Sequence, residues 1–447
     1  MKGQHGKQLI MNYKNRTIIM DKKRTPWTWI PTLYFAQGLP YVAVMTISVI
    51  MYKRLGMSNT DIALYTGWLG LPWVIKPFWS PFVDIIKTKR WWTVAMQWLV
   101  AIALAGIAFT IPTPFYVQFT FAIFMLMGFA SATHDIAADG FYMLALDEHE
   151  QSFYVGIRST FYRIATVIGQ GVLVMLAGSI ETASGNIPLA WSVVFIVLSA
   201  FFFGIVIYHN WILPRPAVDA NRHNTDAKSI IDGFIKAFKT FFTKMPFWQT
   251  VAAIGFMLLY RFPEAMLTKI IQPFLLDPVE KGGLGLSTSE VGLVYGTVGV
   301  IGLTLGGIIG GMAAAKGGLK KWLHPMAWSM SLTCLTFVYL SYAQDHSLFT
   351  VCTCVFIEQF GYGFGFTAYM LFLIYYSEGE FKTSHYAICT GFMALSMMTG
   401  MVAGWLQETI GYQHFFIFTV ICCVTTIGMA SLIKVNPNFG KKVSETK

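Results

Sequence analysis

Long apolar runs separated by short polar segments recur along nearly the whole chain. Each run holds about twenty residues or more, and at about 1.5 Å per residue a helix of that length crosses a hydrocarbon core of about 30 Å. The pattern predicts twelve membrane-spanning helices, at 28–51, 62–83, 91–111, 115–145, 152–180, 190–212, 246–276, 288–314, 322–342, 347–377, 384–409 and 413–433. Several exceed one bilayer thickness, so we expect tilted or kinked helices.

The composition favours a membrane protein over a soluble enzyme. Of the 447 residues, 55% are hydrophobic and 12% are charged, whereas an ordinary soluble domain has about 25% charged residues. The first 26 residues carry seven Lys or Arg and no apolar stretch long enough for a signal peptide, so we expect the first span to remain in the mature protein. The sequence therefore predicts a multi-pass protein of the inner membrane.

The six cysteines predict neither a metal site nor a cofactor site. All lie in predicted helices and none has the CxxC spacing of a zinc site, so we interpret them as buried small hydrophobic residues. They are Cys334, Cys352, Cys354, Cys389, Cys422 and Cys423.

The distribution of basic residues fixes the orientation of the chain. With both termini in the cytoplasm, 24 Lys and Arg lie on the inside and three, Lys53, Arg54 and Lys281, on the outside. Because Lys and Arg are retained on the cytoplasmic side during insertion, this split predicts an N-in, C-in topology. It also accounts for the net charge of +10, so no nucleic-acid partner is needed to explain it.

An internal repeat divides the chain into two halves. Residues 55–67 align with residues 284–296 at an offset of 229 residues, about half the chain, so the second and eighth helices begin alike. Two halves of six helices enter the membrane in the same direction, as in the major facilitator architecture. We expect a cytoplasmic tail at 1–26, halves at 27–212 and 246–434, a linker at 213–245 and a second cytoplasmic tail at 435–447.

The linker contains an amphipathic segment that predicts an interfacial helix. We expect this helix to lie on the inner leaflet, as a tether more than as a regulatory element. Its apolar stripe consists of Ile230, Ile231, Phe234, Ile235, Phe238, Phe241 and Phe242.

Four charged residues lie inside the fourth and fifth predicted helices. Asp135 and Asp139 are four residues apart and share a helix face, and the numbering of an antiparallel hairpin places Asp139 level with Arg158 and Asp135 level with Arg163. Asp135 lies about 18 Å from the cytoplasmic turn, near mid-membrane, and Asp139 about 12 Å. Two interpretations stay open: structural ion pairs that fix helix register, or a proton carrier whose charge is balanced between desolvation and arginine.

His134 admits a chemical alternative. His134 and Asp139 fit the H-x4-D pattern of some acyltransferases, but the pattern lies within a hydrophobic helix and no nucleophile is resolved nearby. Cavity lining and helix packing are both consistent with His134.

The seventh and tenth predicted helices add further buried charges. Arg261 and Glu264 are three residues apart and can form an ion pair, with Pro263 breaking the helix between them and Lys269 further on. The alternatives are a binding site or gate and a kink neutralised by its own ion pair. Glu358 has no obvious partner, so it is either protonated or reached by a basic group from another helix.

A cluster of charges at the cytoplasmic end of the second helix predicts a gate. Lys76 and Asp84 flank a Pro-Phe-Trp-Ser-Pro segment, and Lys89 and Arg90 follow. Their depth allows the side chains to reach water by snorkelling, which favours a gating latch over a substrate site.

Several of these motifs together resemble the AmpG muropeptide permease family, a branch of the major facilitator superfamily that is also similar to acetyl-CoA transporters. The motifs are Gln37-Gly-Leu-Pro40, residues 76–84, residues 132–139, Tyr162-Arg163, residues 260–264 and residues 272–275. The resemblance implies proton-driven import of anhydromuropeptides or of GlcNAc-anhydroMurNAc during cell-wall recycling. It also implies that Asp135, Asp139 and Arg163 line the transport path.

We therefore expect a monomeric proton symporter that works by alternating access. Asp135 with Arg163, and Asp139 with Arg158, are the expected proton-coupling residues. The alternatives are a transporter of another organic anion or an oligosaccharide, a membrane-embedded acyltransferase, and a receptor that does not transport. The expected substrate-binding residues are Gln37, Trp68, Trp73, His134, Arg261, Glu264, Glu358 and Tyr362, with the two tryptophans and Tyr362 stacking on a ring.

Overall fold

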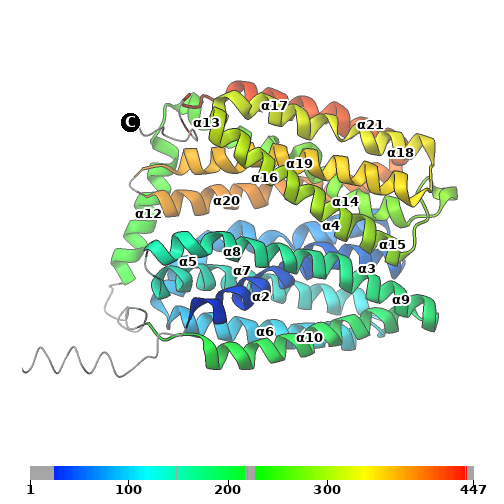
Figure 1. The fold of residues 1–447 in the computed structure, drawn as a ribbon, viewed down its shortest axis with the longest axis horizontal. Coiled ribbons are helices and arrows are strands. Elements are labelled where there is room, and N and C mark those ends of the chain that lie inside the picture. The colour runs from blue at the N-terminus through cyan, green and yellow to red at the C-terminus, as the bar shows by residue number, and fades with distance from the viewer. Residues whose placement is uncertain are drawn as a thin grey trace, which may run out of the picture.

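The computed structural model describes residues 25–146, 148–216, 219, 227–379, 381–437 and 439. These residues form an all-helical protein in which long helices run side by side (Figure 1). Most of the two predicted cytoplasmic tails and part of the linker lie outside the described residues. The side chains of Asp84 and Lys382 are also outside them.

The N-terminal half contains six spans, three of them interrupted. The first joins α2, the π-helical segment η2 and α3; the second joins α4 and α5 across a break at Leu69 and Gly70; the fifth joins α8, η3 and α9. The bounds are α2 Ile30–Val42, η2 Ala43–Ile47, α3 Ser48–Arg54, α4 Asn59–Trp68, α5 Leu71–Ile85, α6 Lys89–Thr110, α7 Tyr116–Ala145, α8 Glu148–Val167, η3 Ile168–Leu173, α9 Val174–Ser184 and α10 Ile187–Ile212.

The C-terminal half repeats this plan. The seventh span is broken at Tyr260 and Arg261, and Gly411, with a φ of 78°, separates the eleventh span from the twelfth within α21. The bounds are α13 Phe247–Leu259, α14 Phe262–Leu276, α15 Thr288–Val291, η6 Gly292–Gly299, α16 Val300–Gly317, α17 Leu319–Leu332, α18 Leu335–Ala343, α19 Leu348–Ser377, α20 Lys382–Met398, η7 Thr399–Val402 and α21 Ala403–Leu432.

The predicted number of spans agrees with this arrangement. Within the described residues, nine continuous helical stretches are long and apolar enough to cross a membrane, and one of them, Ser384–Leu432, is 49 residues long and holds two spans. The second and ninth spans complete the twelve, because each is divided into two shorter helices by an internal turn.

The internal repeat is visible in local geometry. Ser58 caps α4 by accepting a hydrogen bond from the Asp61 N–H, and Ser287, 229 residues later, caps α15 in the same way. Glu290 completes a capping box with Ser287. A serine whose side chain replaces a missing backbone partner starts both helices, so the repeat encodes the same helix start twice.

The linker helix α12 (Ala227–Thr243) lies across the ends of the spans, at the end that the charge distribution assigns to the cytoplasm (Figure 1). Its buried Phe241 packs on Tyr376 of α19 and Phe392 of α20, and Phe238 contacts Phe78 of α5. The helix therefore touches both halves. Just beyond it the Lys244 ammonium lies 4.2 Å from the centroid of the Tyr376 ring, and burial lowers the pKa of Lys244.

Candidate functional site

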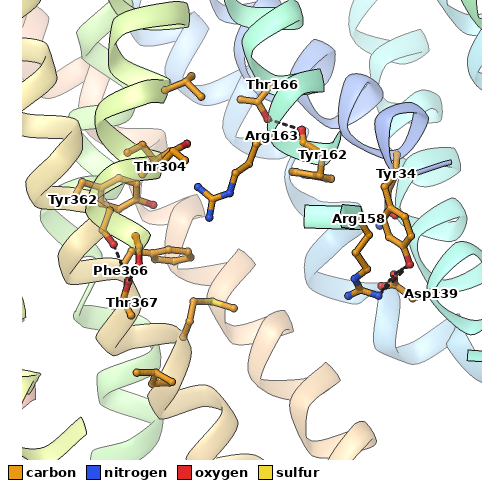
Figure 2. A pocket seen from close by; sticks show the side chains of 17 residues that line it. Tyr34, Asp139, Arg158, Tyr162, Arg163, Thr166, Thr304, Tyr362, Phe366 and Thr367 are labelled. Atoms are coloured by element: carbon orange, nitrogen blue, oxygen red, sulfur yellow. Dashed lines mark hydrogen bonds and ion pairs between the residues drawn. The ribbon is translucent and has the colours of Figure 1, made fainter. Parts of the chain in front are cut away.

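A cavity of about 620 Å³ lies between the two halves, in their cytoplasmic part (Figure 2). Its two walls differ in character. The N-terminal wall is polar and charged, and is formed by Tyr34, Gln37, Asp139, Arg158, Tyr162, Arg163 and Thr166. The C-terminal wall is mainly apolar and aromatic, and includes Val300, Leu303, Thr304, Tyr362, Phe366, Thr367, Met370 and Leu371. The two walls would fit a small molecule that has one charged face and one apolar face.

One predicted ion pair is present in the wall. Nη1 of Arg158 lies 3.4 Å from Oδ1 of Asp139, and both side chains are about a third to a half exposed. Tyr34 joins them, because its hydroxyl donates to Asp139 Oδ1 at 3.1 Å and accepts from Arg158 Nη1 at 3.0 Å. The Arg158 guanidinium also lies 5.0 Å and 5.1 Å from the ring centroids of Tyr34 and Tyr142. Sequence reasoning identified the charged pair and missed the two tyrosines.

The second predicted pair, Asp135 with Arg163, is wrong for this structure. Among the described residues no ion pair joins them; Asp135 instead accepts a hydrogen bond from Trp73 Nε1 at 3.1 Å. The reason is rotational. Residues turn by about 100° each around a helix, so Asp135 and Asp139 share a face, but Arg158 and Arg163, five residues apart, point about 140° from one another.

Arg163 consequently projects into the cavity (Figure 2). Its Nη2 reaches toward α16, 3.8 Å from where a Cβ on Gly307 would stand, and no carboxylate of the described residues lies within ion-pairing distance of it. A half-buried guanidinium with no acidic partner is expensive to keep in a protein interior. The cavity thus presents an uncompensated positive charge opposite the aromatic wall.

Gln37 lies in the cavity wall, as predicted, and its Oε1 is buried without a hydrogen-bond partner among the described residues. A buried amide oxygen left unpaired favours a ligand donor or a water molecule. Trp73 is buried behind this wall, where it contacts Tyr41 at 5.1 Å between ring centroids. Trp68 does not line the cavity and is 44% exposed.

His134 does not line the cavity and is buried between helices, which agrees with the helix-packing alternative; substrate binding by His134 stays a prediction. Its Nε2 accepts from Gln97 Nε2 at 2.9 Å, and the Gln97 Oε1 bonds His209 Nδ1 at 2.9 Å. His209 Nε2 in turn bonds Thr32 Oγ1 at 2.9 Å. Because the amide nitrogen of Gln97 donates and its amide oxygen accepts, His134 accepts at Nε2 and His209 donates from Nδ1. This buried chain of hydrogen bonds joins α2, α6, α7 and α10.

The Arg261 side chain packs behind the aromatic wall. Its guanidinium lies 4.7 Å from the Phe366 ring centroid, 5.6 Å from that of Tyr362 and 5.7 Å from that of Tyr369, and Nη2 donates to the Tyr362 hydroxyl. Stacking on aromatic faces stabilises a cation without an acid. Tyr362 itself lines the cavity.

The predicted pair of Arg261 and Glu264 does not form an ion pair among the described residues. Arg261 is the residue before α14, with φ −100° and ψ 10°, so it lacks the helical geometry that brings residues three apart together. Glu264 accepts from Thr268 Oγ1 at 3.2 Å, and Glu358 accepts from Gln359 Nε2 at 2.8 Å. No basic group from another helix reaches Glu358 in the described part of the chain.

The predicted cytoplasmic gate residues make their described contacts within the N-terminal half and the linker. The N–H groups of Lys89 and Arg90 donate to the Asp219 carboxylate at 2.8 Å and 3.2 Å, and Arg90 Nε donates to the Leu213 carbonyl at 3.3 Å. Asp219 thereby binds the first turn of α6, where free N–H groups attract an anion. A gating role for Lys76, Asp84, Lys89 and Arg90 stays a prediction.

The opposite end of the molecule is closed by polar contacts between the halves that sequence reasoning missed. Lys53 Nζ lies 2.7 Å from Asp277 Oδ1, and Asn59 Nδ2 donates to Gln407 at 2.6 Å and to Tyr412 at 2.9 Å. A second group centres on Glu181, which binds Arg54 at 3.0 Å, Thr288 at 2.7 Å and Trp191 at 2.9 Å. Lys53 and Arg54 were predicted to mark the outside, and that position also puts them at this closure.

The comparisons with known proteins agree with this architecture. The family model described as Major Facilitator Superfamily matches residues 32–268, more than half of the chain. The chain belongs to the Major Facilitator Superfamily. A Rickettsia conorii protein named as transporter AmpG 4 is 27% identical over 408 residues, which cover 88% of this chain and 93% of that protein. The anhydromuropeptide permease of Escherichia coli K12 is 24% identical over 409 residues, 88% of this chain and 76% of that one.

Solved structures of other superfamily members show the same fold. The nucleoside transporter NupG superposes with a TM-score of 0.69 at 15% identity, over 93% of this chain and all of that one. A D-xylose-proton symporter superposes with a TM-score of 0.65 at 13% identity, over 93% of this chain and 99% of that one.

These comparisons confirm the AmpG-like resemblance and the major facilitator fold. The protein is a transporter and not an enzyme, because its relatives are permeases and its structural neighbours are transporters. The predictions of a multi-pass protein of the inner membrane and of a small-molecule substrate are confirmed as well. The cavity lies in the cytoplasmic part of the molecule and the opposite end is closed, so the structure has an inward-facing conformation.

Proposed function

We propose that this transporter imports an anionic amino sugar, GlcNAc-anhydroMurNAc or an anhydromuropeptide, into the cytoplasm and that protons drive the uptake. The observation that carries the proposal is the Arg163 guanidinium, which projects into the cavity without an acidic partner. A substrate carboxylate would supply the missing partner, and charged hydrogen bonds of this kind are among the strongest available to a protein.

The remaining lining residues support a sugar as the rest of the substrate. Tyr362 and Phe366 offer ring faces to the apolar side of a sugar ring, and Gln37 Oε1 offers an acceptor to a hydroxyl or amide N–H. The E. coli relative is named as an anhydromuropeptide permease. Another organic anion is the second candidate substrate, because Arg163 requires a negative charge and the aromatic wall requires a ring, and neither feature requires a sugar.

Asp135 is the first candidate for the proton-coupling group. It lies deeper than Asp139, near mid-membrane, and its described hydrogen bond comes from the uncharged indole of Trp73. Protonation of a buried carboxylate removes a charge that water does not solvate, so the protonated fraction of Asp135 depends on the polar and charged groups around it. The halves at 27–212 and 246–434 would rock about the cavity as a monomer to expose this group to each side in turn.

The test is uptake into liposomes. Purified protein takes up labelled GlcNAc-anhydroMurNAc with and without an inward proton gradient, and wild type is compared with Asp135→Asn and with the control Asp232→Asn on the exposed face of α12. We expect gradient-driven uptake that Asp135→Asn abolishes and the control retains. Equal gradient-driven uptake by all three removes Asp135 from coupling, and no uptake by folded wild type withdraws this substrate.

A further inference from the structure

Lys269 is a buried base that neither the cavity wall nor the proposed coupling step uses. It lies on α14, it is 5% exposed, and its Nζ donates to Thr66 Oγ1 of α4 at 3.0 Å. The helices α14 and α4 belong to different halves and lie beside one another (Figure 1). This hydrogen bond therefore places the Lys269 ammonium in the interface between the two halves.

The positive charge of Lys269 has little to balance it. An ammonium has three N–H donors, and its one described acceptor is the neutral hydroxyl of Thr66, which donates its own hydrogen to the Ile62 carbonyl at 2.6 Å. Within the described part of the chain, no carboxylate lies within ion-pairing distance of Nζ. A charge held in this way inside a membrane is costly, and such groups mark the paths of substrates and ions.

The contact between Lys269 and Thr66 lies between the cavity and the closed end. Along α4, Thr66 follows Asn59 of the closed end by seven residues, about 10 Å. Along α14, Lys269 lies eight residues, about 12 Å, beyond Arg261 in the direction of Asp277, which also belongs to the closed end. An opening between the halves that runs from the outside to the cavity therefore separates Lys269 from Thr66.

Close helix packing holds the contact shut in the inward-facing conformation. A Cβ on Gly400 of η7 would lie 3.1 Å from Lys269 Cγ, and a Cβ on Gly67, next to Thr66, would lie 2.1 Å from Met401 Cγ. The segment η7 thus packs against both α14 and α4. The ammonium becomes accessible from the outside only when these elements separate.

We propose that Lys269 binds the negative charge of the carried anion in the outward-facing conformation, and that Thr66 replaces the anion when the outer end closes. The inference rests on the proposed function, because it takes the cargo to be an anion. A carboxylate forms a stronger hydrogen bond with an ammonium than a neutral hydroxyl does. Each half then supplies one positive group, Lys269 on the outer side and Arg163 in the cavity, and closure passes the anion from the first to the second.

The attraction for anions is tested without any substrate. Thr66→Cys places a thiol at the contact, and two membrane-impermeant thiosulfonate reagents, one anionic and one cationic, are applied to right-side-out vesicles. We expect the anionic reagent to react faster, and the ratio of the two rates to fall roughly tenfold when Lys269→Met is added. The control Lys316→Met, at an exposed position near the cytoplasmic end of α16, should keep the ratio.

Two results of this labelling experiment overturn the proposal. One is a ratio of rates that Lys269→Met leaves unchanged. The other is a thiol at Thr66→Cys that neither reagent modifies from the outside, measured against the unsubstituted chain.

Uptake then tests the link between Lys269 and the cargo. Loss of a buried charge also favours the closed outer end, which raises the KM of every substrate from the outside by the same factor. The comparison is therefore between GlcNAc-anhydroMurNAc and an analogue whose carboxylate is amidated. We expect Lys269→Met to raise the KM of the acid by roughly 10- to 100-fold relative to that of the amide, and Lys316→Met to change neither.

An equal rise in KM for both sugars, or no rise for either, overturns the role of Lys269 in binding the anion. Absence of uptake by folded wild type withdraws the proposed substrate instead. In that case the ratio of labelling rates alone decides whether Lys269 attracts anions, so the two failures are distinguished.

Discussion

Arg158 and Arg163 occupy the same helix and the same cavity wall, yet their surroundings are opposite. Arg158 has a carboxylate, a tyrosine hydroxyl and two ring faces within reach, whereas Arg163 has none of these among the described contacts. The first arginine is part of the wall. The second has no acidic partner among the described residues, so we expect it to be the arginine that binds a ligand.

Replacement of Arg163 should therefore discriminate between substrates by charge. A hydrogen bond to a charged group contributes about 1.5–3 kcal/mol, so Arg163→Gln should raise the KM for GlcNAc-anhydroMurNAc by roughly 10- to 100-fold. The KM for an analogue whose carboxylate is amidated should change little. Uptake kinetics of both sugars in the same liposomes provide the measurement.

Two results would contradict this assignment. An equal rise in KM for the acid and the amide would show that Arg163 shapes the cavity without reading charge. An unchanged KM for the acid would show that the carboxylate binds elsewhere. Folding is checked by comparing the gel-filtration profile of Arg163→Gln with that of wild type.

At the scale of residues, the sequence predicted how deep a side chain lies in the membrane but not which side of its helix it faces. Residue numbers along a hairpin placed Asp139 opposite Arg158, and the structure has that pair. The same numbers paired Asp135 with Arg163, but depth says nothing about which side of a helix a residue faces. The predicted i, i+3 pair of Arg261 and Glu264 failed because Arg261 itself lies in the break between α13 and α14, outside the helix that holds Glu264.

At the scale of elements, the closed end depends on glycines as much as on charges. The backbone of α21 touches that of α4 where a Cβ on Gly404 would lie 1.9 Å from the Asn59 carbonyl oxygen. A similar contact joins η6 to η3, where a Cβ on Gly296 would lie 2.0 Å from the Gln170 carbonyl oxygen. Small residues let helix backbones approach in this way inside a membrane.

A methyl group at the first contact should hold the closed end apart. We expect Gly404→Ala to abolish uptake, because the halves can no longer close on that side. Gly428→Ala, in the twelfth span, should have little effect on uptake, since nothing lies within 4 Å of its added Cβ. Alanine is the better helix former by about 1 kcal/mol, so neither change should weaken α21 itself.

The measurement combines uptake with the reactivity of a cysteine introduced for Asn59, in both glycine backgrounds. Greater labelling from the closed side in Gly404→Ala than in Gly428→Ala supports the steric account. If Gly404→Ala takes up substrate as fast as wild type does, the transport cycle does not need the close approach of the α21 and α4 backbones at this position.

The elements themselves were largely predictable. Apolar runs of spanning length located all twelve spans to within a few residues, and the repeat at 55–67 and 284–296 marked two helix starts that the serine caps then confirmed. The π-helical segments η2, η3 and η6 were not predictable, because they leave the apolar pattern of a span unchanged. They depend on how neighbouring helices approach one another, as at Gly296.

At the scale of the whole molecule, the contacts between the halves are unevenly distributed along the membrane normal. The hydrogen bonds between described side chains of the two halves gather at the closed end, around Asn59 and Glu181. The cavity occupies the other end. Sequence reasoning gave two similar halves but could not indicate which end is closed, because both conformations use the same helices.

A cysteine in the cavity should report this asymmetry. Thr304→Cys places a thiol of nearly the same size on the C-terminal wall. We expect a membrane-impermeant thiol reagent to modify it in inside-out vesicles and not in right-side-out vesicles, with protection by substrate. Labelling is measured against the unsubstituted chain, whose cysteines are buried or half-buried. Equal labelling in both vesicle types would contradict a molecule that rests open to the cytoplasm.

The unlike walls of the cavity have a consequence for compounds that are not carried. One half lines the cavity with charged side chains and the other with ring surface, so under the proposed function we expect a cargo with both features to draw the two halves together. A small organic acid without a ring would engage only the N-terminal wall, and an uncharged aromatic would engage only the C-terminal wall. Either would occupy the site and leave the halves apart, so we expect such compounds to act as blockers of the transporter.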